Sequence, residues 1–237
     1  MSQSDLLPIR IATSEGEDFD SDIIAVHQFP MSERLAKGFF APEPLTVVNA
    51  RDSNGRLAQP PLHFPMLAGG RSIVLIGFMG VGKSSIGKAL ARKIGLPRFD
   101  TDEFVSKQFD LSVSEIFSRF GEEHFRAAET EALRQLSEAP PTIIVTGGGI
   151  VLRPENVKML RRLGTVVSLE ADAETLFRRI SRRATRPLLQ TANPRETVVA
   201  LLSVRGPLYR AAADARLDTS RLTIDEAADA ILKSIEK

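Results

Sequence analysis

GFMGVGKSS, residues 77–85, is the most informative stretch of this 237-residue chain. The apolar run before it, residues 72–78, is typical of a strand buried on both faces of a sheet. An amphipathic helix is expected after it, with Ile86, Leu90 and Ile94 on one face. Glycines between a buried strand and a helix let backbone N–H groups and the positive helix end face one anion. The stretch therefore predicts a phosphate-binding loop.

The loop matches the pattern G-x-x-x-x-G-K-[ST], which a simple glycine turn would match only by chance. In this pattern the lysine, Lys83, reaches the β- and γ-phosphates, and the hydroxyl of Ser84 ligates Mg²⁺. We therefore expect a nucleoside triphosphate with Mg²⁺ as cofactor. The expected nucleotide contacts are Gly80, Val81, Gly82, Lys83, Ser84 and Ser85.

Strands and helices are expected to alternate through residues 69–237, which predicts a doubly wound α/β domain with a parallel sheet. Thr223 and Glu226 form a capping box before the last helix. Further strands are expected at 142–149, 164–171 and 215–220, with a short one ending at Asp100, and further helices at 101–109, 113–119, 122–137, 156–163, 173–183, 194–213 and 224–235.

Residues 1–68 have a different composition. They carry a net charge of −4 and seven of the 14 prolines, whereas the remainder has a net charge of +5. Residues 1–30 contain six acids and a single base, Arg10, which is unlike a signal or transit peptide. We expect a loosely ordered extension of unknown role. Met66 offers an alternative start just before the regular pattern.

The bulk composition excludes several classes of protein. Apolar residues make up 43% and charged residues 26%, which is ordinary for a soluble globular chain. The absence of cysteine excludes disulfides and thiolate metal sites. A net charge of +1 disfavours nucleic-acid binding, and no apolar run approaches the roughly 20 residues that span a bilayer. We expect a cytoplasmic monomer without nucleic-acid or membrane partners.

The phosphoryl acceptor stays open at this point: water in an ATPase or GTPase, or a hydroxyl compound in a kinase. No NKxD-like segment is present, which disfavours a GTPase. The strand at 142–149 lacks the aspartate that typically ends the second phosphate-site strand. Asp100 and Asp102 in FDTDEF are the acids that can serve instead.

Over residues 71–236 the chain resembles the shikimate kinase family. The resemblance rests on GFMGVGKSSIGKALA, FDTD, FRAAE, GGG, RPLL and RGPLY, in this order. It implies a P-loop NTPase three-layer sandwich with a central parallel sheet of about five strands and a mobile lid at about 179–193. It also implies ATP-dependent phosphorylation of the 3-hydroxyl of shikimate to shikimate 3-phosphate, in chorismate and aromatic amino acid biosynthesis.

The resemblance also implies roles on the acceptor side. Asp102 hydrogen-bonds the 3-hydroxyl and serves as general base, while Asp100 supports Mg²⁺ with Ser84. Arg126 and Arg205 clamp the carboxylate of shikimate, a task that suits the planar guanidinium fork. Glu129 can orient Arg126, and Gly148 contacts the ring of shikimate through its backbone.

On the nucleotide side, Arg186 in RPLL matches the lid arginine that stabilises charge on the transferring phosphoryl group. It joins Lys83 and Asp102 as a catalytic residue. Arg179 and Arg221 are assigned to the adenine side. Two alternatives remain: a related small-molecule kinase such as a gluconate kinase, and a kinase-like regulator that uses its extension for interactions.

Overall fold

The computed structural model describes residues 70–181 and 193–235. The predicted extension at 1–68 and the part of the predicted lid at 182–192, including Arg186, lie outside these ranges. Among the described residues, no helix is long and apolar enough to span a membrane.

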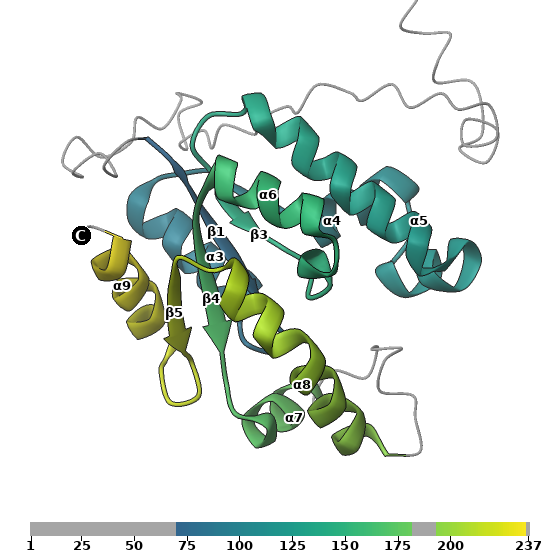
Figure 1. Ribbon diagram of the computed structural model, residues 1–237. Coiled ribbons are helices and arrows are strands. Elements are labelled where there is room, and N and C mark those ends of the chain that lie inside the picture. Colours follow the sequence, from purple (N-terminus) through teal and green to yellow (C-terminus); the bar gives the residue numbers. More distant parts are fainter. Residues whose placement is uncertain (1–69, 182–192, 236–237) are drawn as a thin grey trace, which may run out of the picture. The chain divides into compact units, whose positions relative to one another are not determined.

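A parallel sheet of five strands forms the centre of the described domain (Figure 1). Each neighbouring pair of strands is parallel, in the order β2-β3-β1-β4-β5. The strands are β1 (Ser72–Gly77), β2 (Arg98–Asp100), β3 (Ile143–Val145), β4 (Gly164–Glu170) and β5 (Ala215–Asp218). This arrangement confirms the predicted α/β fold with a parallel sheet of about five strands.

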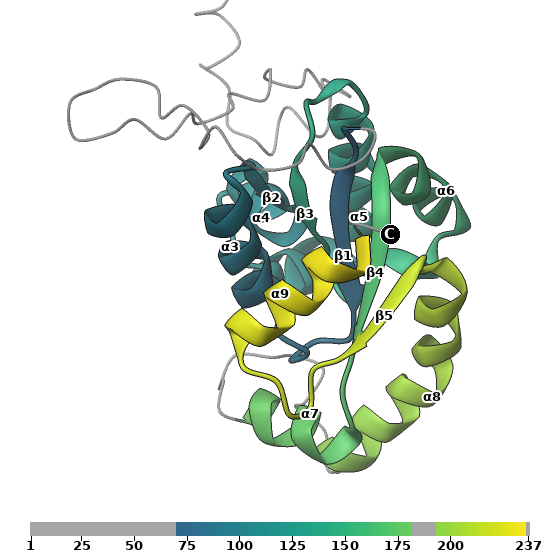
Figure 2. The same ribbon diagram turned by 90° about the vertical axis from the view of Figure 1, so that its left-hand side faces the viewer.

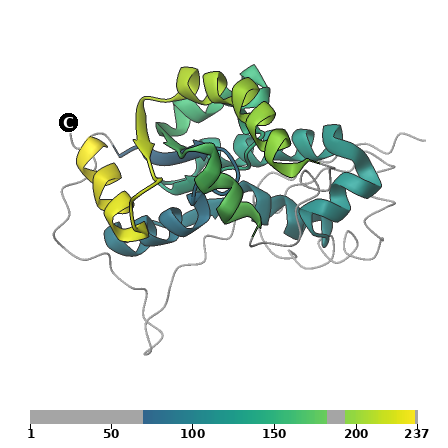
Figure 3. The ribbon, with the colours of Figure 1, turned by 90° about the horizontal axis from the view of Figure 1, so that it is seen from below.

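Helices cover both faces of the sheet, which gives three layers (Figures 2 and 3). On one face lie α3 (Lys83–Ile94) and α9 (Ile224–Ile235), and on the other lie α6 (Pro154–Leu163) and α8 (Pro194–Ala212). The other helical elements are α4 (Thr101–Phe109), α5 (Val113–Gln135), α7 (Ala173–Ser181) and the 3₁₀ turns η1 (Leu136–Glu138) and η2 (Ile150–Leu152).

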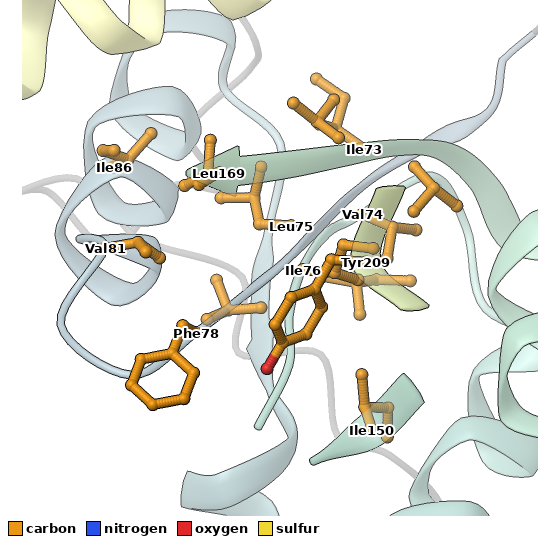
Figure 4. Close-up of a cluster of buried hydrophobic side chains, with 14 of the residues drawn as sticks. Ile73, Val74, Leu75, Ile76, Phe78, Val81, Ile86, Ile150, Leu169 and Tyr209 are labelled. Carbon is orange, nitrogen blue, oxygen red and sulfur yellow. The ribbon is translucent and has the colours of Figure 1, made fainter. Parts of the chain in front are cut away.

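Strand β1 is the centre of the hydrophobic core, and every one of its residues is buried. Side chains alternate across a sheet, so β1 contacts both helical layers. Figure 4 shows Leu75 on the side of Ile86 from α3, and Ile76 beside the ring of Tyr209 from α8. This double burial explains why the strand reads as a continuous apolar run rather than an alternating one.

The helix boundaries agree with the sequence prediction, with informative differences. The two helices expected on either side of residues 120–121 form one element, α5, in which Gly121 has a non-helical φ of 82°. The strand expected at 142–149 ends at Val145, and its glycines form the turn into η2. The capping box is confirmed, because the Thr223 N–H donates to Glu226 Oε2 at 2.8 Å and the Glu226 N–H donates to Thr223 Oγ1 at 3.3 Å.

The strand register places three important loops at one edge of the sheet. Leu75 pairs with Val145, and Asp100 pairs with the same residue from the other side. The phosphate loop, the Asp100 region and the glycine turn therefore all follow the carboxyl ends of adjacent strands. In open α/β sheets, ligands bind at this edge, where the strand order reverses.

Candidate active site

The phosphate loop takes a backbone shape that requires glycine. Gly80 has a φ of 85° and Gly82, directly before α3, has a φ of 102°, both in the left-handed region. Lys83 is only 9% exposed, and its Nζ donates to the carbonyls of Gly77 at 2.7 Å and Phe78 at 3.0 Å. The loop therefore holds an ammonium group and a helix N-terminus at the same place.

A cavity of about 480 Å³ opens in front of this loop. It brings together ten residues that the sequence assigned to the site. These are Gly80, Val81, Gly82, Lys83, Ser84, Ser85, Asp100, Asp102, Gly148 and Arg179.

Asp100 joins the end of β2 to the phosphate loop. Its Oδ1 caps α4 by accepting the N–H groups of Asp102 at 3.1 Å and Glu103 at 3.4 Å. Its Oδ2 accepts Ser84 Oγ at 3.3 Å and Arg98 Nη1 at 3.0 Å. The first turn of α3 and the start of α4 are thus tied together through one buried carboxylate.

The carboxylates of Asp102 and Glu129 both lie where a side chain on Gly147 would stand. A Cβ added to Gly147 would lie 2.5 Å from Asp102 Oδ1 and 2.3 Å from Glu129 Oε1. Only glycine leaves room for both carboxylates, so α4 and α5 meet at this residue. The side chain of Glu129 is fully buried.

Arg126 is fixed by two carboxylates and two aromatic rings. Its Nη1 donates to Glu129, and its Nε and Nη2 donate to Glu122 Oε1 at 3.2 and 2.9 Å. The guanidinium lies 5.7 Å from the ring centre of Phe117 and 5.3 Å from that of Phe125. The guanidinium of Arg126 is therefore held in one place, and its side chain is only 9% exposed.

Burial and charge act against each other in this pair. Burial lowers the pKa of Arg126, but the charges and hydrogen bonds of Glu129 and Glu122 outweigh it, so the pKa is raised overall. Burial raises the pKa of Glu129 to about 7, with Asp102 adding to the rise and Arg126 and Arg153 opposing it. Glu129 therefore titrates near neutral pH.

The glycine turn after β3 connects Arg126 to Arg205. A Cβ on Gly149 would lie 2.2 Å from the Arg126 guanidinium, so the two are in close contact. The carbonyl of Gly148 accepts the hydroxyl of Tyr209, to which Arg205 also hydrogen-bonds. Burial raises the pKa of Tyr209 to about 12, so the hydroxyl keeps its proton as a donor.

At the other end of the cavity, Arg179 is anchored by Thr219. Its Nη1 approaches Thr219 Oγ1 at 3.2 Å, and its Nη2 donates to the Thr219 carbonyl at 2.8 Å. Thr219 is buried, and its hydroxyl lies within 3.0 Å of the Val81 carbonyl in the phosphate loop. The start of the predicted lid region is thereby connected to both the loop and the end of β5.

The structure does not gather every predicted residue. Arg126 and Arg205 are buried and, like the exposed Arg221, are not among the residues that line the cavity. Arg186 lies outside the described residues. Conversely, the sequence interpretation gave no role to Tyr209, Thr219 or Glu122. Tyr209 stands in the motif RGPLY that carries Arg205, and Thr219 stands beside Arg221 in DTSR, so their motifs were the available signals.

Known proteins share much of this sequence. A family model described as shikimate kinase matches residues 79–236. The shikimate kinase of Thermodesulfovibrio yellowstonii is 44% identical over 167 residues, which cover 70% of this chain and 96% of that protein. The chain belongs to the shikimate kinase family. The shikimate kinase of Cereibacter sphaeroides is 40% identical over 158 residues, covering 67% of this chain and 79% of that protein.

Solved structures of shikimate kinases also resemble this family member. The enzyme from Acinetobacter baumannii in complex with shikimate superposes with a TM-score of 0.68 at 34% identity, covering 72% of this chain and 97% of that one. The enzyme from Aquifex aeolicus gives a TM-score of 0.59 at 34% identity, covering 70% and 96%. The predicted P-loop kinase fold is therefore confirmed.

Proposed function

We propose that this member of the shikimate kinase family transfers the γ-phosphoryl group of ATP to the 3-hydroxyl of shikimate, through the residues around the cavity. One observation supports the assignment above all. A buried, fixed arginine, Arg126, lies against the glycine turn that also borders Asp102, and Asp102 lines the same cavity as Lys83. A cationic clamp and a carboxylate base thus stand beside a phosphate loop.

ATP, the phosphoryl donor, binds at the phosphate loop. The backbone N–H groups of the loop from Gly80 to Ser85 surround the phosphates, and Lys83 neutralises charge on the β- and γ-phosphates. Arg179 lies on the nucleoside side of the cavity, where Thr219 holds its guanidinium. Arg221 is exposed, so it contacts adenine only at the periphery of the site.

The donor atoms near the loop fit Mg²⁺. Ser84 Oγ and Asp100 Oδ2 are oxygen ligands that already meet at 3.3 Å. Within the described residues, no group of three or more His, Cys, Asp or Glu side chains is placed to hold a metal. That matches the usual Mg²⁺ mode of one or two protein oxygens with phosphates and waters. When bound with ATP, the ion would draw charge from the phosphate oxygens.

The acceptor half binds shikimate by its carboxylate. An arginine has five N–H groups, and the described contacts of Arg126 use one on each of its three nitrogens. One N–H on each terminal nitrogen is left, which is the geometry of a bidentate carboxylate contact. Arg205 supplies the second cation, and the N–H of Gly148 contacts the ring.

In the transfer step, the 3-hydroxyl oxygen attacks the γ-phosphorus and the bond from that phosphorus to the β,γ-bridging oxygen breaks, which releases ADP. Asp102 accepts the hydroxyl proton. Lys83 stabilises the charge that develops on the phosphoryl oxygens and the leaving group, and Arg186 is assigned the same task from the lid. Exclusion of water by the lid directs the phosphoryl group to shikimate.

A coupled assay of ADP release tests the proposal against its alternatives. Parallel reactions contain shikimate, gluconate or no acceptor, each with Mg-ATP. We expect ADP release only with shikimate, and the 3-phosphate as the product by NMR. Preference for gluconate would identify a different small-molecule kinase, and release without acceptor would identify an ATPase. A protein that is inactive with every acceptor would support the alternative of a kinase-like regulator.

All residues in this proposal come from one chain, so it requires no second subunit, nucleic acid or membrane. We propose that a cytoplasmic monomer carries out the reaction. Light scattering of the purified full chain tests the oligomeric state, and a stable dimer would contradict that part of the proposal.

A further inference from the structure

Glu129 occupies an unusual place for a carboxylate. It is fully buried in α5, and its Oε2 accepts from Arg126. Among the residues that the structure describes, none donates a hydrogen bond to its Oε1. That oxygen lies against the Cβ position of Gly147, and so does the carboxylate of Asp102. A buried carboxylate oxygen that receives no hydrogen bond and lies beside a second carboxylate is repelled by that neighbour's charge. Both conditions favour the protonated, neutral form of the acid.

We propose that Glu129 is a positioning residue that takes up a proton when the carboxylate of shikimate binds Arg126, so that acceptor binding is linked to pH. The inference rests on the proposed contact between Arg126 and the substrate carboxylate. With shikimate in place, three carboxylates would surround one guanidinium: those of Glu122, Glu129 and the ligand.

Of these three groups, Glu129 is the one in a position to accept the proton. Glu122 is 53% exposed, so water screens its charge. The carboxyl group of the ligand is an ordinary carboxylic acid with a pKa of about 4, so it stays ionised at neutral pH. Glu129 has no contact with water, and added negative charge at Arg126 weakens the attraction that keeps it ionised.

The other charged and titratable groups around Glu129 are few. Arg126 on its own helix and Arg153, before α6, favour its ionised form, whereas Asp102 from α4 disfavours it. Tyr209 from α8 interacts with both Glu129 and Arg126 and stays neutral. None of these groups changes its charge when shikimate arrives, so the added carboxylate is the new influence.

The direction of the pH effect follows. The pKa of Glu129 is about 7 in the free protein, and the anionic ligand raises it further. Below pH 7 the residue is protonated with or without ligand, and the Kd of shikimate is flat. Above pH 7 binding requires proton uptake, so the Kd rises by up to about tenfold per pH unit until the pKa of the complex is passed.

Calorimetry on the full chain tests this inference without ATP. Shikimate is titrated at pH 8 in two buffers with different enthalpies of ionisation, which gives the number of protons taken up. We expect uptake approaching one proton per shikimate in the unaltered protein. The neutral methyl ester of shikimate should cause none, which ties the proton to the ligand charge. Shikimate binding without proton uptake would overturn the inference.

Two variants locate the proton. Glu129→Gln mimics the protonated acid in shape and charge, so it should bind shikimate without uptake and with a flat pH profile, near the low-pH Kd of the unaltered protein. Glu122→Gln removes the other partner of Arg126 and should retain the uptake. Uptake that persists in Glu129→Gln would assign the proton elsewhere and refute the inference.

Two further outcomes distinguish a failure of this inference from a failure of the proposed function. If Glu129→Gln does not fold, as judged by its circular dichroism melt, the pH profile of the unaltered protein still decides, because a shikimate Kd that stays flat above pH 7 would refute the inference. If shikimate fails to bind the unaltered protein at all, the proposed function fails. That outcome is distinct from binding without proton uptake.

Discussion

Replacement of Arg126 by lysine is the sharpest test of the acceptor site. The change keeps the positive charge but removes the planar fork. The guanidinium donates to Glu122 and Glu129 and still has an N–H on each terminal nitrogen for a ligand. An ammonium group has three donors and no fixed plane, so it cannot serve two carboxylates and a bidentate ligand together.

The expected size of the effect on kcat/KM follows from the burial of the Arg126 side chain. Because Arg126 is only 9% exposed, solvent screening reduces its contacts little. The loss of one hydrogen bond between charged groups is worth about 1.5–3 kcal/mol. At about 1.36 kcal/mol per factor of ten, kcat/KM for shikimate should fall by about 10- to 150-fold. The fall should come mainly from KM, because the fork binds ground state and transition state alike.

Steady-state ADP release at varied shikimate and saturating ATP measures this change. Arg134→Lys is a matched control in the same helix. Arg134 also pairs with a glutamate three residues away, Glu131 at 2.9 Å, but its side chain is 57% exposed. Exposed pairs contribute about 0–1 kcal/mol, so the control should stay within about fivefold of the unaltered enzyme. An Arg126→Lys enzyme with the shikimate KM of the control would refute the carboxylate clamp.

Further predictions concern the phosphate loop, the base, the glycine turn and the extension. Lys83→Ala should abolish turnover, and Asp102→Asn should lower kcat far more than it weakens ATP binding; near-normal kcat in either variant contradicts its assigned role. Gly149→Ala places a methyl group 2.2 Å from the Arg126 guanidinium and should raise the shikimate KM, whereas an unchanged KM would show that the guanidinium is free to move. Residues 66–237 alone should fold and retain most shikimate-dependent ADP release, because residues 1–65 contain no assigned site residue; insolubility or loss of activity would show that they contribute to the domain.

Much of the fold was predictable because its signals are local. The phosphate loop is contiguous, and its glycines, Lys83 and the following helix are neighbours in the chain. The strands around it are short apolar runs between turns, and their burial on both faces makes them recognisable. The capping box at Thr223 and the break near Gly121 also depend on residues a few positions apart.

The acceptor site needed more than local pattern. Arg126 and Arg205 were assigned by resemblance to ordered motifs, and the sequence alone leaves each as an ordinary helix arginine. What holds them in place comes from distant segments: Gly149 against one, and Tyr209 with the carbonyl of Gly148 beside the other. Such contacts depend on how α5 and α8 pack around the sheet, which no short stretch encodes.

The chain by itself determined a phosphate loop, an α/β order of elements and the residue types for a kinase, because these follow from local periodicity and from chemistry at fixed spacing. Only the tertiary structure decided the surroundings of Glu129. Its helix position is that of any glutamate three residues after an arginine. Its raised pKa arises because packing removes water and brings the carboxylate of Asp102, 27 residues earlier in the chain, to the same point beside Gly147.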